Sequence, residues 1–204
     1  MKRFLSVFLV LWMGVVILFV FNRSRHKNGP LPELGAVPEF TLMDQRGRGF
    51  SESHLRGKVW IADFIFTRCA GPCPLMTQQL MNIAQDLAAE PDIRFVSFSV
   101  DPDYDTPKVL GEYADKFLAD ANRWFFLTGA RTWIYDLAIK HFHLAAGGLA
   151  EEGSGHILHS TKFVLVDHAL KIRGYYDSLV PEQLQRLRAD AKKLAAETGA
   201  AHAA

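Results

Sequence analysis

The feature that most constrains the fold is a nearly continuous apolar run, VWIADFIFT, at residues 59–67. A run of this kind is typical of a strand that is buried on both faces of a sheet. Apolar residues then recur at helical spacing between positions 76 and 87, and a second buried strand, IRFVSFSV, follows at 93–100. A strand, a helix and a strand in this order predict a βαβ unit, in which the two strands run parallel.

The rest of the chain continues this alternation. Thr106-Pro107 has the pattern of an N-cap followed by proline at the first helical position, and it predicts a helix that ends near Leu118. A third strand is expected at 123–129 and another helix at 131–142. The segments TKFVLVD and KIRGYYD then predict a hairpin, and an amphipathic helix closes the fold at 181–197. We therefore expect an α/β domain with a mixed central sheet flanked by helices.

Length and charge limit the classes of function. With 204 residues, 49% of them hydrophobic, the chain can bury one sizeable core. Its formal net charge is +1, so no overall positive field suggests nucleic acid as a partner. Residues 1–35 hold five Lys/Arg and one Asp/Glu, which leaves 18 basic and 21 acidic residues, a net charge of −3, for the rest. The basic excess thus belongs to the amino terminus.

The amino terminus predicts a transmembrane helix that anchors the chain. The residues from Phe4 to Phe21 form an uncharged stretch of eighteen. As a helix this stretch is about 27 Å long, close to the hydrocarbon thickness of a bilayer. A cleaved signal peptide is the alternative, but basic residues follow the apolar run where a small-x-small cleavage site would be expected. Positive charges on the two sides are nearly equal in number, so they leave the orientation open.

These features divide the chain into four parts. We expect a membrane anchor with basic flanks at 1–27. A linker is expected at 28–38, because this stretch contains three prolines and two glycines. The folded domain then spans 39–197, and a short tail spans 198–204.

The only two cysteines lie in the stretch DFIFTRCAGPCP, from Asp63 to Pro74. This stretch resembles the redox loop of thioredoxins, in which a strand with a buried acid leads into two cysteines at the start of a helix. Here one more residue separates the cysteines. The helix start is expected to stabilise the thiolates of Cys69 and Cys73, and the Gly-Pro turn to expose both sulfurs. Such a pair can form a disulfide or bind a soft metal; a static structural pair is the alternative.

A metal site needs more than two sulfurs, and the thioredoxin architecture suggests where a third ligand lies. In that fold, the residue that faces the cysteine loop comes just before the strand that begins the final hairpin, usually next to a proline. Here Ser160 stands where the proline is expected, and His159 precedes it. Two thiolates and one imidazole form a soft set of ligands that suits copper, particularly Cu(I).

Four segments, in this order behind an N-terminal anchor, resemble the Sco/SenC family: DFIFTRCAGPCP, SFSVDPDYDTPKVLGEYADKF, FFLTG and HSTKFVLVD. The resemblance covers roughly residues 36–195. It implies a membrane-anchored copper chaperone with a thioredoxin-like fold that assists the assembly of cytochrome c oxidase. It also implies that Cys69, Cys73 and His159 are the copper ligands, with copper as Cu(I), Cu(II) or both.

The resemblance implies partners and a location as well. The copper acceptor would be cytochrome c oxidase subunit II or a similar protein, and an upstream copper donor or thiol reductase would act before it. The folded domain would lie outside the cytoplasm. An anchor that begins at residue 4 leaves no room for a mitochondrial presequence, which favours a single-pass protein of the bacterial inner membrane with its domain in the periplasm or extracytoplasmic space.

Several polar residues near the cysteines have more than one interpretation. Asp63 lies six residues before Cys69, where thioredoxins place a buried acid, so it is either a proton relay or a structural aspartate. The three acids of DPDYDTP could bind a hard cation, but the segment lacks the glycine and the final glutamate of a calcium loop, so turn and helix capping are favoured. Arg68 either favours a Cys69 thiolate by its charge or faces solvent.

Three further histidines, His141, His143 and His156, could form a second, weaker copper site. A solvated loop that binds no metal is the alternative.

The alternative class of function is an enzyme, a thiol–disulfide oxidoreductase or a thiol peroxidase that uses Cys69 and Cys73. A peroxidase of the peroxiredoxin type would need a threonine three residues before the cysteine, whereas Thr67 stands two residues before it. A redox enzyme without a metal would not need His159. We therefore expect a chaperone rather than an enzyme, with thiol–disulfide reductase activity as a second possibility.

Overall fold

The structure, a computed structural model, describes residues 12–13, 29–144 and 160–202. Nearly all of the predicted anchor therefore lies outside the described residues. Across the three described ranges, no helix is both long enough and apolar enough to span a bilayer. Residues from Glu33 onward form one compact unit, and the fold described below is that of this unit.

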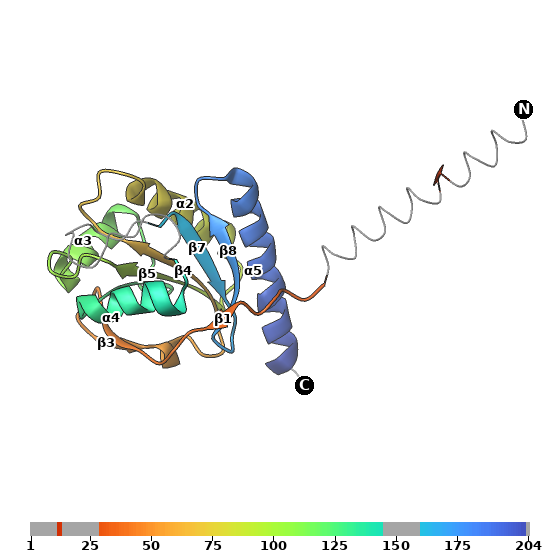
Figure 1. Ribbon diagram of the computed structural model, residues 1–204, viewed down its shortest axis with the longest axis horizontal. Coiled ribbons are helices and arrows are strands. Elements are labelled where there is room, and N and C mark those ends of the chain that lie inside the picture. Colours follow the sequence, from red (N-terminus) through yellow and green to blue (C-terminus); the bar gives the residue numbers. More distant parts are fainter. Residues whose placement is uncertain (1–11, 14–28, 145–159, 203–204) are drawn as a thin grey trace, which may run out of the picture. The chain divides into compact units, whose positions relative to one another are not determined.

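The centre of the fold is an eight-stranded mixed sheet in the order β1-β8-β7-β4-β5-β6-β2-β3 (Figure 1). Three parallel strands form its middle: β4 (Val59–Ile65), β5 (Ile93–Ser99) and β6 (Trp124–Thr128). All seven residues of β4 are buried, as its continuous apolar run predicts. β7 (Lys162–Val166) pairs antiparallel with β4, and β8 (Lys171–Asp177) pairs antiparallel with β7. The predicted parallel strands and hairpin are confirmed.

The outer strands were not expected from the sequence. β1 (Gly35–Ala36) pairs with β8 and lies within the stretch 28–38 that the proline content suggests as a linker. β2 (Thr41–Asp44) and β3 (Gly49–Ser51) form a short hairpin that is joined to β6. A single 3-10 turn, η1 (Glu52–His54), follows β3. These strands are too short to produce a clear alternating pattern in the sequence.

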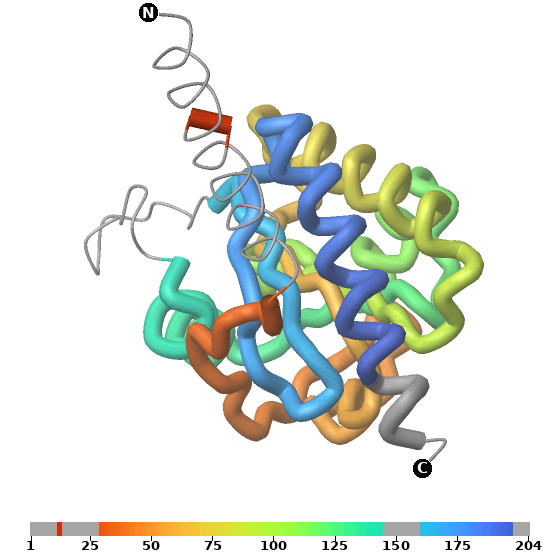
Figure 2. The backbone as a smooth tube through the Cα atoms, turned by 90° about the vertical axis from the view of Figure 1, so that its right-hand side faces the viewer, coloured from red at the N-terminus to blue at the C-terminus, as the bar shows by residue number. Residues whose placement is uncertain are grey.

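Helices cover both faces of the sheet. The crossover helices α2 (Cys73–Asp86) and α3 (Pro107–Lys116) lie on one face together with the C-terminal helix α5 (Pro181–His202) (Figures 1 and 2). The other face is covered by α4 (Arg131–Asp136), which continues into the π-helical segment η2 (Leu137–His141). The two crossovers lie on the same face because both connections are right-handed and move across the sheet in the same direction.

Aromatic side chains fill the space between the sheet and η2. The Phe142 ring lies 5.3 Å from the Phe64 ring and 5.8 Å from the Phe98 ring, and its edge faces Trp60 at 6.1 Å. Successive residues of a strand point to opposite faces of the sheet. Asp63, between these aromatic positions of β4, therefore points to the face that carries α2.

The segments that carry the polar residues of interest meet at one end of the sheet. The carboxyl ends of β4, β5 and β6 lie there, so the loops at 66–72 and 100–106 lie side by side, and α4 begins next to them. β7 runs in the opposite direction, with Ala62 paired to Val164, so the start of β7 lies at this same end. Ligand sites of open α/β sheets lie at the carboxyl ends of the strands.

Candidate metal centre at the cysteine loop

The two cysteines lie where the loop after β4 enters α2. Cys73 is the first residue of α2, and Pro74 is the second. Both thiols are free and buried, with Cys69 7% exposed and Cys73 4% exposed. The backbone N–H of Gly71 donates a hydrogen bond to the Cys69 sulfur at 3.3 Å. The expectation that the Gly-Pro turn exposes the sulfurs is wrong, because both side chains are buried.

Burial also changes the acidity of Cys73. The pKa of its thiol is raised to about 12, mainly by burial; a hydrogen bond from the Phe66 backbone lowers the pKa, and the neighbouring Cys69 thiol and the Asp63 carboxyl raise it. The sequence-based expectation of a stabilised thiolate is therefore wrong for Cys73. Desolvation outweighs the favourable electrostatic effect of the helix start.

Asp63 is a fully buried acid on the same face of the sheet as α2. Its carboxyl is 0% exposed, and neither oxygen has a hydrogen-bond partner of ordinary geometry. Burial raises the pKa of Asp63 from 3.8 to about 7, although the hydroxyl of Ser97, the paired residue on β5, lowers it somewhat. An acid that titrates near neutrality has the acidity that a proton relay requires.

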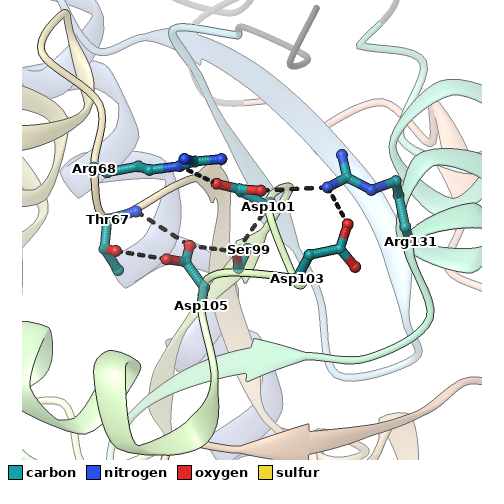
Figure 3. A network of polar contacts seen from close by, with 7 residues as sticks. All are labelled: Thr67, Arg68, Ser99, Asp101, Asp103, Asp105 and Arg131. Carbon is teal, nitrogen blue, oxygen red and sulfur yellow. Dashed lines mark hydrogen bonds and ion pairs between the residues drawn. The ribbon is translucent and has the colours of Figure 1, made fainter. Parts of the chain in front are cut away.

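The acidic segment DPDYDTP holds the cysteine loop in place (Figure 3). The buried Asp105 carboxylate accepts hydrogen bonds from the Thr67 backbone N–H at 3.1 Å and from the Thr67 hydroxyl at 2.5 Å. It also accepts one from the Ser99 hydroxyl at 2.5 Å. Thr106 caps α3 as predicted, its hydroxyl accepting from the Val109 N–H at 3.4 Å.

The other acids of this segment bind arginines. Asp101 is buried and accepts from Arg68 at 2.6 Å and from Arg131 at 3.3 Å, and Arg131 also binds Asp103 at 2.7 Å. The guanidinium group of Arg68 lies over the Tyr104 ring, 5.0 Å from its centroid. The Arg68 side chain is 55% exposed, as the solvent-facing alternative expects, and its positive charge is paired with Asp101.

These contacts were missed in the sequence because their residues are far apart in the chain. Thr67 and Asp105 are separated by 38 positions. The signal that could have found them is the topology: both follow the carboxyl ends of adjacent parallel strands.

The predicted histidine ligands are only partly described. His159 and His156 lie outside the described residues. The Ser160 hydroxyl accepts a hydrogen bond from the Lys162 N–H at 3.2 Å, just before β7 begins. Within 12–13, 29–144 and 160–202, no group of three or more His, Cys, Asp and Glu side chains is arranged to hold a metal.

The other two histidines are separated from the cysteine loop. The His141 ring packs 6.3 Å from the Trp133 ring. The exposed His143 lies beside Gly35 of β1, and strands β8 and β7 separate β1 from β4. The structure thus does not bring His141 or His143 to the cysteine pair.

The fold and the site define a thioredoxin-like α/β protein with two free thiols at the start of the helix that follows a central strand. The SCO1/SenC family model matches residues 31–196. The chain belongs to this family, as the resemblance of its motifs indicated.

Similar proteins agree with this assignment. The "SCO1 protein homolog" of Bacillus subtilis is 37% identical over 145 residues, which are 70% of this chain and 74% of that protein. The solved structure of BsSco, described as a member of the Sco family of cytochrome c oxidase assembly proteins with a disulfide switch, is 32% identical with a TM-score of 0.70 over 81% of this chain and 97% of that one. Yeast Sco1 with copper bound is 25% identical, with a TM-score of 0.61 over 79% and 90% of the two chains.

Proposed function

We propose that this chain is a copper chaperone that binds one copper ion through Cys69, Cys73 and His159 and assists the assembly of the binuclear copper centre of a cytochrome c oxidase. The observation that carries the proposal is the pair of free, adjacent thiols at the end of the sheet where β7 begins. Yeast Sco1 with copper bound and the oxidase-assembly protein BsSco support it by family.

The ligand types fit copper. Two thiolates and one imidazole are soft and borderline donors, which suit Cu(I) and tolerate Cu(II). Ser160, the residue after His159 in the sequence, lies just before β7, which begins at the end of the sheet that carries the cysteine loop. This position of Ser160 supports His159 as the third ligand.

The buried site suits a cargo that must be released again. Without copper, the high pKa of Cys73 keeps its thiol protonated at neutral pH, so copper binding displaces at least that proton. When a partner's ligands take the copper, Cys73 takes up its proton again. Proton uptake thus assists the release of copper. The burial of Cys73 also limits the amount of thiolate that could react with oxidants.

Two observations favour the chaperone over the enzyme. A thiol with a pKa of about 12 supplies little thiolate for attack, which disfavours catalysis that begins at Cys73. The Thr67 hydroxyl donates to Asp105, so it is engaged away from the cysteine that a peroxidase would activate. Thiol–disulfide exchange that begins at Cys69 stays the second candidate, and the disulfide switch described for BsSco favours it.

The test of the proposal is copper titration of the reduced full-length chain against a competing chelator. The expected stoichiometry is about one copper ion, and Cys69→Ser or Cys73→Ser should abolish tight binding, since one thiolate and one imidazole leave copper under-coordinated. His159→Ala should weaken the binding of Cu(II) more than that of Cu(I), because Cu(I) tolerates coordination by two sulfur ligands alone. Unchanged affinity for both oxidation states in His159→Ala would remove this residue from the site.

The location is part of the same proposal. We place the anchor at residues 4–21 in a bacterial inner membrane, with the domain on the extracytoplasmic side. Both native thiols are buried, so a reagent would reach them poorly. Topology is therefore best measured on a variant that carries Cys69→Ser, Cys73→Ser and a new cysteine at the exposed position 89, Ala89→Cys. A membrane-impermeant thiol reagent should label this variant in intact spheroplasts. Labelling only after lysis would place the domain in the cytoplasm.

A further inference from the structure

The two sulfurs of the cysteine pair are positioned by different parts of the fold. Cys73 belongs to the first turn of α2, so the helix places it. Cys69 lies in the loop, where its N–H donates to the Phe66 carbonyl at 3.2 Å and so closes the turn from Phe66 to Cys69. Within this turn, the side chains of Thr67 and Arg68 both reach another segment of the chain, Thr67 at Asp105 and Arg68 at Asp101. Of the two, Thr67 is also held through its backbone N–H, so the placement of Cys69 depends on what holds Thr67.

Asp105 holds Thr67 by both of its polar groups. One carboxylate oxygen accepts from the Thr67 backbone N–H and the other from its hydroxyl (Figure 3). The first oxygen also accepts from Ser99, whose hydroxyl in turn accepts from the Asp101 N–H at 3.1 Å. Asp105 thus joins the turn that carries Cys69 to the end of β5 and to the loop that leads into α3.

Hydrogen bonds hold the Asp105 carboxylate. Asp105 is 0% exposed, and its hydrogen-bond partners are two hydroxyls and one backbone N–H; among the described residues, no arginine or lysine forms an ion pair with it. A buried carboxylate without a paired cation is costly to bury, and hydrogen bonds with fixed directions must compensate. Such an arrangement restricts the position of the turn more tightly than apolar packing would.

We propose that Asp105 is a positioning residue of the copper site: through Thr67 it sets the position of the Cys69 sulfur relative to Cys73. The inference rests on the proposed copper function but concerns a residue that does not touch the metal. Because the contacts are present in the dithiol form, their loss should destabilise the dithiol that copper requires relative to the disulfide.

The test measures three quantities on the reduced full-length chain: the Cu(I) dissociation constant, the thiol–disulfide equilibrium constant in glutathione buffers, and the unfolding midpoint in urea. Asp105→Ala removes all three hydrogen bonds. Asp105→Asn keeps the shape and one acceptor oxygen, and the Thr67 hydroxyl can turn to accept from its amide. Asp103→Asn is the matched control, since Asp103 belongs to the same segment, is 79% exposed and binds Arg131.

A finer pair of variants separates the side chain from the backbone of the turn. Thr67→Val removes the hydroxyl but keeps the backbone N–H that donates to Asp105, whereas Thr67→Ser keeps both donors. Thr67→Val should weaken Cu(I) binding, whereas Thr67→Ser should bind Cu(I) as tightly as the wild type does.

For Asp105→Ala we expect Cu(I) binding to weaken roughly tenfold or more, since hydrogen bonds to a charged group are the strong ones. The thiol–disulfide equilibrium should move about tenfold towards the disulfide, a fall in midpoint potential of about 30 mV for a two-electron couple. Asp105→Asn should lie between the wild type and Asp105→Ala, and Asp103→Asn should match the wild type.

A lower unfolding midpoint in Asp105→Ala with both constants unchanged would overturn the proposal, because it would make Asp105 a purely structural residue. If the wild type does not bind Cu(I) but the thiol–disulfide constant still shifts in Asp105→Ala, the copper function fails while the positioning of Cys69 by Asp105 is supported. Equal effects of Asp103→Asn and Asp105→Ala would also overturn it, since the exposed control does not contact Thr67.

Discussion

The hydroxyl groups of Thr77 and Tyr113 lie 2.9 Å apart beneath the first turn of α2, and the Thr77 hydroxyl donates to the Cys73 carbonyl, also at 2.9 Å. Because Thr77 uses its one hydrogen for that carbonyl, Tyr113 must donate to Thr77. Both residues are buried, so α3 supports the start of the helix that places Cys73.

This relationship predicts unequal costs for the two partners. Tyr113→Phe should lower the free energy of unfolding by about 1 kcal/mol, since Thr77 keeps its bond to Cys73. Thr77→Val should cost about 2 kcal/mol, because it removes both bonds and leaves the Tyr113 hydroxyl buried without a partner. Urea unfolding of the two single variants and the double variant measures this. A double variant as costly as the sum of the single ones would show that the two hydroxyls do not interact.

The buried Asp63 predicts that the domain becomes less stable as the pH rises. The native state keeps the proton of Asp63 up to about pH 7, whereas the unfolded chain loses it near the ordinary pKa of 3.8. The native state therefore binds more protons between these values, and the free energy of unfolding decreases as pH rises through this window. At about 1.4 kcal/mol per pH unit, the total decrease is on the order of 4 kcal/mol.

Asp63→Asn removes this titration, so its stability should exceed that of the wild type increasingly from pH 4 to pH 7 and then by a constant amount. Urea unfolding of both chains across this range checks it, with Asp103→Asn as the exposed control. Parallel stability curves for Asp63→Asn and the wild type would show that Asp63 has an ordinary pKa.

The raised pKa of Cys73 predicts that copper binding depends on pH. Each copper bound displaces at least the Cys73 proton throughout the neutral range, because its pKa is about 12. The apparent Cu(I) association constant should therefore rise about tenfold or more for each pH unit between about pH 6 and pH 9. Chelator competition at several pH values, corrected for proton binding to the chelator, measures the slope. A flat profile would mean that Cys73 is not a ligand.

The left-handed backbone conformation of Leu118 predicts that a substitution at this position stabilises the domain. Leu118 follows the C-cap of α3 with a φ of 51°, and its side chain is 82% exposed. The Ala119 N–H donates to the Ala114 carbonyl, as in a Schellman motif, whose left-handed position is usually glycine. Leu118→Gly should raise the free energy of unfolding by roughly 1 kcal/mol. Leu118→Ala keeps the Cβ strain and should not, which makes it the control in thermal or urea unfolding.

The main elements of the domain could be predicted from the sequence. The continuous apolar run of β4, the similar run of β5 and the helical spacing between them are local patterns, and burial in the centre of a sheet demands such patterns. The N-cap at Thr106 is local as well, since its hydroxyl binds an N–H three residues later. The positions of Cys69 and Cys73 at the start of a helix followed from the same kind of evidence.

The tertiary structure alone decided the environment of the site. Whether the cysteines are buried, and whether Cys73 is a thiol or a thiolate at neutral pH, depends on how the loop packs against the rest of the domain. The contacts of Thr67 with Asp105 join residues 38 positions apart, and those of β1 with β8 join positions near 35 and 172. Residue type and local spacing determine which elements form, but burial and charge pairing come from contacts between distant segments, which no local pattern encodes.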